Sequence, residues 1–153
     1  MKAVPLSSQN TVEFTPSLPF SQHSRVAVVN GYDIWAVGDS SSVGGSNAQT
    51  LIENWNGSSW SIISSPNASS ESVSTSVAVV NGDDIWAVGY AIPFQDTTLT
   101  ENWNGSKWSV VSSPDPGSGA GGLNGVAVVN GNDIWAVGDD QGITYQTLIE
   151  NYC

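Results

Sequence analysis

"VAVVNGYDIWAVG", residues 26–38, is the stretch that decides the fold, because it occurs three times in the chain. It returns as "VAVVNGDDIWAVG" at 77–89 and as "VAVVNGNDIWAVG" at 126–138, first 51 and then 49 residues further on. A fixed period of this length indicates one supersecondary unit that is used repeatedly. We therefore treat the chain as three copies of one unit.

A second phrase follows each copy and completes the unit. It reads "TLIENWNGSSWSIISSP" at 50–66, "TLTENWNGSKWSVVSSP" at 98–114, and "TLIENYC" at 147–153. The apolar run "VAVV", an Asn-Gly turn, "DIWAVG", "TLIENW" and "WSII" predict four short strands joined by turns. Trp55 and Trp60 flank the second Asn-Gly turn, so we expect them to form a cross-strand aromatic pair.

Four strands at a period near 50 residues are typical of a β-propeller blade. The predicted fold class is all-β, and the predicted units cover approximately 26–66, 77–114 and 126–152. With their alternating "DIWAVG" and "WNGSSWS" phrases, the units resemble the kelch-like, tryptophan-rich propeller repeats of many bacterial proteins. This resemblance implies the propeller fold and carries no activity with it.

The third unit stops before its fourth strand. We expect "TVEF", residues 11–14, to replace that strand, because it precedes a Pro, a loop and "VAVV" as "WSVV" does at 108–111. A blade buries its faces against neighbouring blades, so three blades would leave two outer faces exposed. The sequence thus predicts a head-to-tail homodimer that closes a six-bladed ring. A nine-bladed trimer and a fragment of a longer propeller are the alternatives.

The composition limits the kinds of partner. Three basic residues against fourteen acidic residues give a net charge of −11. Phosphate backbones and anionic lipid need clustered Lys and Arg, so we expect neither nucleic-acid nor membrane partners. No apolar run approaches the roughly 18 residues of a membrane span, and no signal peptide is evident. The sequence therefore assigns no location, and cytoplasmic is only the default. The single cysteine, Cys153, predicts an exposed thiol or an interchain disulfide.

Catalytic motifs are absent from the sequence. His23 is the only histidine, and no serine has the context of a nucleophile elbow. Asp139 and Asp140 are adjacent, but two carboxylates are far fewer than the about six to eight oxygen ligands of calcium. We therefore predict no cofactor, no metal and no enzymatic activity, with a glycosidase that uses two channel-lining carboxylates as the alternative.

Two carboxylates recur in every unit. Asp33, Asp84 and Asp133 follow the first turn, where a short acidic side chain would accept backbone N–H bonds and hold the turn. Each recurring glutamate lies in mid-strand, where an ionised group needs hydrogen bonds. We expect it to hold a neighbouring blade's backbone or a tryptophan N–H. These glutamates are Glu53, Glu101 and Glu150.

The phrase "TENWNGSKW" is also similar to the repeats of the small fucose-binding propeller lectins, which assemble six-bladed rings from short chains. That resemblance implies that the three glutamates accept sugar hydroxyls and that Trp60 and Trp108 stack on the sugar. "DIWAVG" has no Arg where that family has one, so a neutral glycan would need a different donor.

The loops after "IWAVG" differ among the units, and loops on a rigid scaffold commonly carry binding groups. We predict a binding or interaction scaffold, with either a carbohydrate or a protein partner, and solvated loop residues as the alternative to a loop site. The acidic and aromatic residues of these loops are Asp39, Tyr90, Phe94, Asp96, Asp139, Asp140 and Tyr145.

Overall fold

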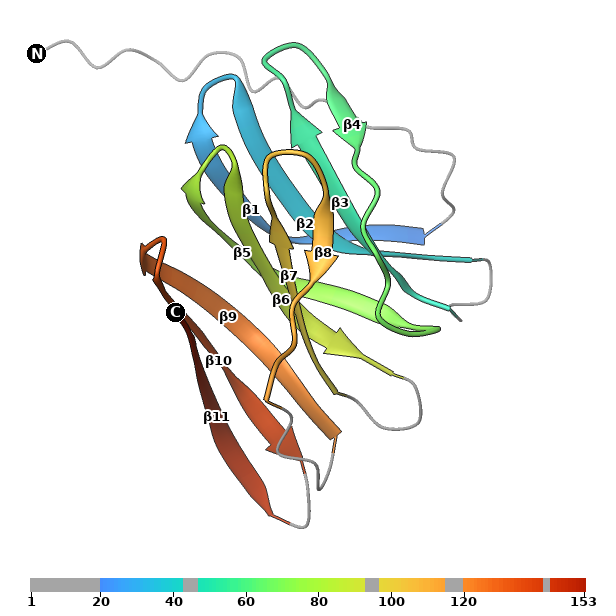
Figure 1. The fold of residues 1–153 in the computed structure, drawn as a ribbon. Helices are drawn as coiled ribbons and strands as arrows, with labels where there is room; N and C mark the ends of the chain where they lie inside the picture. Colours follow the sequence, from blue (N-terminus) through green and yellow to red (C-terminus); the bar gives the residue numbers. More distant parts are fainter. Residues whose placement is uncertain (1–19, 43–46, 93–96, 115–119, 142–143) are drawn as a thin grey trace, which may run out of the picture.

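The computed structural model describes residues 20–42, 47–92, 97–114, 120–141 and 144–153, and within these ranges it contains eleven strands and no helix. The strands form three antiparallel sheets in which neighbours along the chain are also neighbours in the sheet. The all-β class and the repeated antiparallel unit are therefore confirmed. We call the sheets the first, second and third blade (Figure 1).

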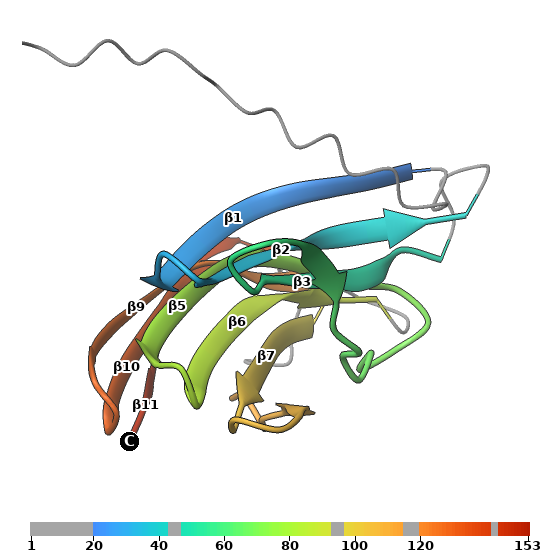
Figure 2. The same ribbon diagram turned by 90° about the horizontal axis from the view of Figure 1, so that it is seen from above.

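The first blade contains β1 (Phe20–Asn30), β2 (Asp33–Ser41), β3 (Gln49–Trp55) and β4 (Trp60–Ile62). The second contains β5 (Ser72–Asn81), β6 (Asp84–Ala91), β7 (Thr97–Trp103) and β8 (Trp108–Val110). The third contains β9 (Ala120–Asn130), β10 (Asp133–Gln141) and β11 (Tyr145–Tyr152). The first strands of the blades, β1, β5 and β9, pack near one another, and the sheets fan out from them (Figure 2).

The turn between β1 and β2 is held by an asparagine side chain. Asn30 pairs with Asp33, so Gly31 and Tyr32 are the two central residues of the turn. The Oδ1 atom of Asn30 accepts a hydrogen bond of 2.8 Å from the Tyr32 backbone N–H. The side chains of Asn81 and Asn130 make the same contact in the other two blades. This local bond is the reason that asparagine suits the position.

The aspartates after this turn bind side chains, so the prediction that they accept backbone N–H bonds of the turn is wrong. Asp33 Oδ1 accepts a hydrogen bond of 2.7 Å from the side-chain amide of Asn54 on β3. The equivalent bonds join Asn102 to Asp84 and Asn151 to Asp133. Each aspartate therefore ties the second strand of its blade to the third.

The turn between β3 and β4 forms as predicted. Gly57 has a φ of 92°, a conformation that glycine adopts without steric cost. Asn56 Oδ1 accepts hydrogen bonds from the backbone N–H groups of Ser58 and Ser59. The predicted aromatic pair is also confirmed, because the ring centroids of Trp55 and Trp60 lie 5.8 Å apart.

The glycine that ends "IWAVG" allows two strands to approach closely. A Cβ atom on Gly38 would overlap the carbonyl oxygen of Gln22 and lie 2.8 Å from the Cα of His23. The β1–β2 register shifts immediately after this point, between His23 and Arg25. Such an irregularity leaves no room for a side chain on the facing strand.

Two apolar layers hold the blades together. Between the first and second blades, Trp35, Val37 and Ile52 pack against a surface of the second blade. That surface is formed by Val77, Ile85, Ala87 and Trp108. Between the second and third blades, Val88 packs with Leu123 and Ala136. The core of the molecule therefore lies between the sheets, as expected for stacked blades.

The outer edge of the third blade is open within the described residues. There β11 pairs with β10 alone, whereas β3 and β7 each pair with a strand on both sides. Residues 11–14, which we expect to supply the missing strand, lie outside the described residues. That pairing stays a prediction.

Candidate functional site

Two of the three repeated glutamates lie inside the contacts between blades. Glu101 and Glu150 are buried, and each accepts a hydrogen bond from a serine of the preceding blade. Ser65 Oγ donates to Glu101 Oε1 at 2.8 Å, and Ser113 Oγ donates to Glu150 Oε2 at 2.6 Å. The two serines follow β4 and β8, where the chain passes from one blade to the next. These carboxylates therefore join neighbouring blades through serine hydroxyls, whereas a backbone or indole partner was expected.

Glu53 in the first blade has a different partner. It is buried, and its Oε2 atom lies 2.5 Å from Nε2 of His23 on β1. Ser74 and Leu123 occupy the place of His23 in the other blades, next to the equivalent glycines Gly89 and Gly138. The repeated motif does not predict this pair, because His23 belongs to the variable start of β1.

Burial changes the acidity of two groups between the blades. It raises the pKa of Glu101 to about 7, a shift that the hydrogen bond from Ser65 partly offsets. The other carboxylate oxygen of Glu101 has no hydrogen-bond partner. Burial also raises the pKa of Tyr152 to about 12, and the hydrogen bond from its hydroxyl group to Glu150 adds to this shift. Both groups are therefore suited to a protonated state in a poorly solvated contact.

The two tryptophans predicted to stack on a sugar differ in accessibility. Trp108 is buried, with its ring centroid 5.7 Å from Trp35 and 6.1 Å from Trp103. Trp60, its counterpart in the first blade, is only half-buried. Because Glu53, Glu101, Glu150 and Trp108 are all buried, the surface of the described structure does not offer them to a sugar.

The predicted loop residues do not converge on one site. Asp39 is buried and accepts a hydrogen bond of 3.0 Å from Gln22, and Asp139 accepts one of 2.7 Å from Asn124. Asp140 is buried, whereas Tyr145 is exposed at the start of β11. Tyr90 and Asp139 line a polar cavity of about 260 Å³ between the second and third blades. Phe94 and Asp96 lie outside the described residues.

The described residues contain no cluster of three or more His, Cys, Asp or Glu that could hold a metal ion. The described residues form no helix that is long and apolar enough to cross a membrane. Cys153 is a free, exposed cysteine.

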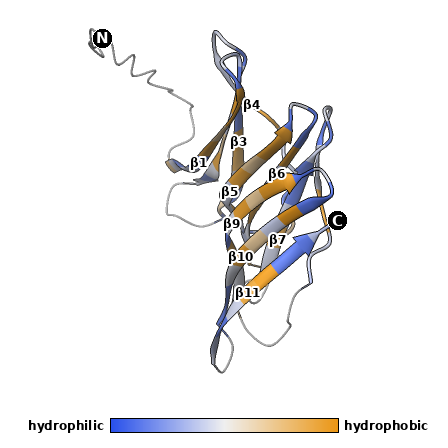
Figure 3. Cartoon of the chain, turned by 90° about the vertical axis from the view of Figure 1, so that its left-hand side faces the viewer, coloured by the Kyte–Doolittle hydropathy of each residue, from blue (hydrophilic) through white to orange (hydrophobic). Residues whose placement is uncertain are grey.

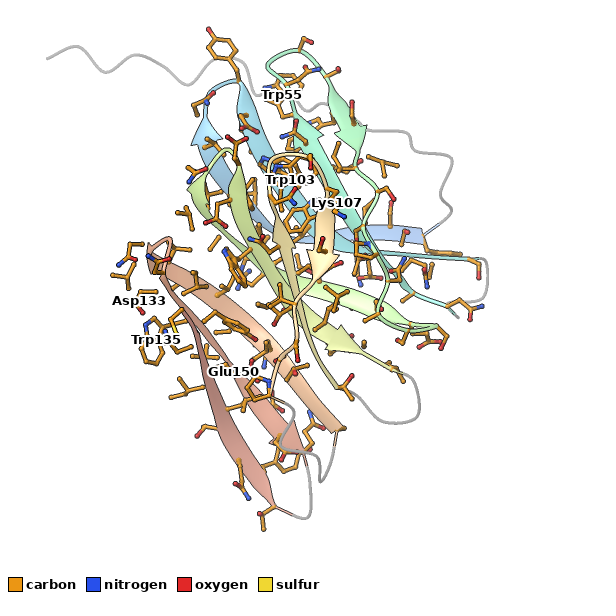
Figure 4. All side chains as sticks on the ribbon, in the orientation of Figure 1. Trp55, Trp103, Lys107, Asp133, Trp135 and Glu150 are labelled. Carbon is orange, nitrogen blue, oxygen red and sulfur yellow. The ribbon has the colours of Figure 1, made fainter. Side chains whose placement is uncertain are left out.

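The third blade exposes the side chains that the first blade buries. Trp35, Val37 and Ile52 are 4%, 0% and 0% exposed against the second blade. Their counterparts on the outer face of the third blade are 44%, 48% and 64% exposed. These are Trp135, Val137 and Ile149, and Figure 4 shows Trp135 at the outer side of β10. Figure 3 views the same side, with apolar segments along β9, β10 and β11.

The first blade exposes two valines on its own outer surface. Val77 of the second blade is 8% exposed, whereas its counterpart Val26 is 61% exposed. Val28, two residues further along β1, is 60% exposed. We call the outer surfaces of the first and third blades the terminal faces. Large exposed apolar patches commonly mark interaction sites in proteins.

A cavity lies beside the open edge of the third blade. Its volume is about 480 Å³, and its lining includes Trp86, Ile134 and Tyr152. The rings of Trp86 and Tyr152 lie 5.4 Å apart, as Trp35 and Trp103 do at 5.0 Å in the preceding contact. There Trp108 packs against both rings. A cavity of about 520 Å³ lies at the equivalent place in that contact, beside Trp103 and Trp108, so the hollow is a repeated feature of the contacts between blades.

Comparison with known proteins shows the fold. No protein-family model matches the sequence, and no curated protein matches it. Among solved structures, the chain is similar to "YCF48 bound to D1 peptide", with a TM-score of 0.53 and 16% identity. The similarity covers 84% of this chain and 40% of that one, so the chain spans less than half the length of this structural relative. That structure is a β-propeller, so the similarity shows that this chain has the β-propeller fold.

Proposed function

We propose that this protein is a non-enzymatic interaction scaffold that binds a protein partner through its terminal faces. The observation that carries the proposal is the exposure of Trp135, Val137 and Ile149, whose repeat counterparts are almost completely buried. Burying large apolar side chains is worth about 1.5–3 kcal/mol each, so covering this surface would stabilise a complex. The similar solved structure is described as bound to a peptide, which agrees with a binding role for the fold.

The position of the carboxylates supports the non-enzymatic part of the proposal. The three repeated glutamates contact serine or histidine side chains between or within blades. A glycosidase needs a pair of carboxylates on either side of a substrate bond. Buried carboxylates that hold the blades together do not serve this purpose.

Carbohydrate binding is a second and more specific candidate function. Among the residues predicted to bind a sugar through the repeated phrase, only Trp60 is half-exposed and supports it. Two of its main groups, Glu53 and Glu101, are buried. Calorimetric titration with neutral sugars tests it directly, and heat that disappears in Trp60→Ala would favour it over protein binding.

A retention experiment tests the scaffold. The wild-type chain and Trp135→Ser are immobilised and exposed both to extract of the source cells and to purified wild-type chain carrying another tag. We expect the wild type to retain protein from at least one of these and Trp135→Ser to retain much less, because the terminal face has lost its largest apolar side chain.

The control is Tyr32→Asp at the β1–β2 turn. Its counterpart in the second blade is Asp83, which stays exposed although that blade has neighbours on both sides. The Tyr32→Asp variant should therefore retain as much protein as the wild type. Equal retention by wild type and Trp135→Ser would contradict the proposal, as would a wild type that retains nothing.

A further inference from the structure

We propose that the partner of each terminal face is a second copy of this chain, bound head to tail. In this complex the third blade of each copy packs on the first blade of the other, and six blades close into a ring. The proposal rests on the proposed function, because it names the partner of the same faces. It differs from that function in requiring no other protein.

The interface already exists inside the chain. Trp35, Val37 and Ile52 of the first blade form one side of the contact with the second blade. The other side is formed by Val77, Ile85, Ala87 and Trp108. This contact buries nearly every one of these side chains, so its two surfaces are complementary in shape.

The terminal faces carry the same residue types as this contact. Trp135, Val137 and Ile149 repeat the first side without a change of residue. On the first blade, the other side is repeated as Val26, Ile34, Ala36 and Trp60, again without a change. A second copy therefore offers each terminal face the surface that its repeat counterpart already binds.

The turn glycines support the same arrangement. A Cβ atom on Gly82 would lie 3.4 Å from Asp33 Oδ2 of the preceding blade, and one on Gly131 would lie 3.7 Å from Asp84 Oδ2. Gly31, the counterpart in the first blade, has nothing within 4 Å. In the ring, the partner's Asp133 would approach Gly31 and repeat the contact a third time.

The orientation follows from the two faces being different. A contact between two third blades would place Trp135 and Val137 against themselves, a pairing that occurs nowhere in the chain. A head-to-tail contact is heterologous, and two copies satisfy both terminal faces of each chain when the ring closes. This leaves no apolar face exposed.

Mass measurement by light scattering tests the proposal in about 0.15 M salt, where repulsion between two chains of charge −11 is screened beyond about 8 Å. The chain has a mass of 16.0 kDa, so we expect twice this value for the wild type. Val137→Asp and Val26→Asp should each reduce the mass to that of one chain, because each places a charge in the contact. Both residues are exposed in the single chain, so the variants should fold, which circular dichroism verifies.

Mixing the two variants tests the head-to-tail geometry. The first blade of Val137→Asp and the third blade of Val26→Asp are both unchanged, so one intact contact can form between unlike variants. We expect the mixture to regain the mass of two chains. The control variant Tyr32→Asp adds the same charge outside the contact, so it should have the mass of two chains on its own.

Several results would overturn the proposal: a wild type with the mass of one chain at every concentration, a mass of three chains, or a mixture that stays dissociated. These outcomes differ from a failure of the scaffold function. A wild type that is monomeric and still retains another protein through Trp135 would remove the second copy as partner and leave the scaffold in place.

Discussion

At the scale of single residues, the contact between blades depends on buried carboxylates. Glu101 accepts a hydrogen bond from Ser65, and its second oxygen has no partner. An ionised carboxylate in such a site is poorly solvated, so burial favours the protonated form. Glu53 instead faces His23, whose Nε2 atom lies 2.5 Å from its Oε2 atom. The same residue type is therefore accommodated in two ways in neighbouring repeats.

Glu101 should make the stability of the protein depend on pH. Its pKa in the folded protein is about 7, above the ordinary value of 4.5. Between these values the unfolded chain has released a proton that the folded chain keeps. The free energy of unfolding should therefore fall by about 3 kcal/mol as the pH rises from 4.5 to 7, and this contribution should stay constant above pH 7.

Urea unfolding across this pH range measures the effect. Glu101→Gln cannot ionise, so its free energy of unfolding should lack this decrease. Glu71→Gln removes the same charge from a partly exposed site and should keep the decrease. If Glu101→Gln and wild type lose stability in parallel, the buried carboxyl is not the cause.

At the scale of the strand pair, each blade needs a glycine opposite an irregularity in its first strand. Gly138 shows this in the third blade, where a Cβ atom would overlap the Gly122 carbonyl oxygen and lie 2.8 Å from Leu123 Cα. The β9–β10 register shifts between Val137 and Gly138. The backbone itself blocks a side chain here, and backbone cannot move aside as a flexible side chain can.

Gly138→Ala should therefore destabilise the protein by about 1–3 kcal/mol or more, the usual cost of overpacking. Gly121→Ala is the matched control in the same sheet, because its Cβ atom would meet nothing closer than the Asp139 carbonyl oxygen at 3.8 Å. Thermal unfolding of both variants compares them directly. A Gly138→Ala variant as stable as Gly121→Ala would show that the strands can separate at low cost.

At the scale of the whole molecule, three blades leave two apolar terminal faces and one open strand edge. Exposed strand edges are sites of pairing with other chains. The edge of β11 lies beside the cavity lined by Trp86 and Tyr152. A strand added at this edge would complete the blade.

Deletion of residues 1–16 should weaken the dimer or cause aggregation, because residues 11–14 would no longer complete the third blade of the partner. Deletion of residues 1–10 keeps this segment and serves as the control. Light scattering over a range of concentrations measures both. Equal dimer affinity for the two deletions would show that residues 11–14 do not fill the edge.

The sequence was sufficient to predict the repeat, the four strands of a blade, the Trp55–Trp60 pair and the positive φ of Gly57, because these depend on local patterns. It misassigned the hydrogen bonds of Asp33, whose partner Asn54 is 21 residues away and only the sheet register brings it close. The pair formed by His23 and Glu53 was also missed, since nothing in the repeated motif includes a histidine.

The amino-acid order is enough to establish that the chain is all-β, strongly acidic and built from one repeated blade, because alternation, turn residues and period are properties of neighbours along the chain. Whether Glu101 is a surface acceptor or a buried link between blades depends on which sheets stack and on which side. The same is true of Trp35 and Trp135, which both stand in the phrase "DIWAVGD". One is covered by a neighbouring blade and the other is exposed, because burial is set by contacts between blades that no local pattern contains.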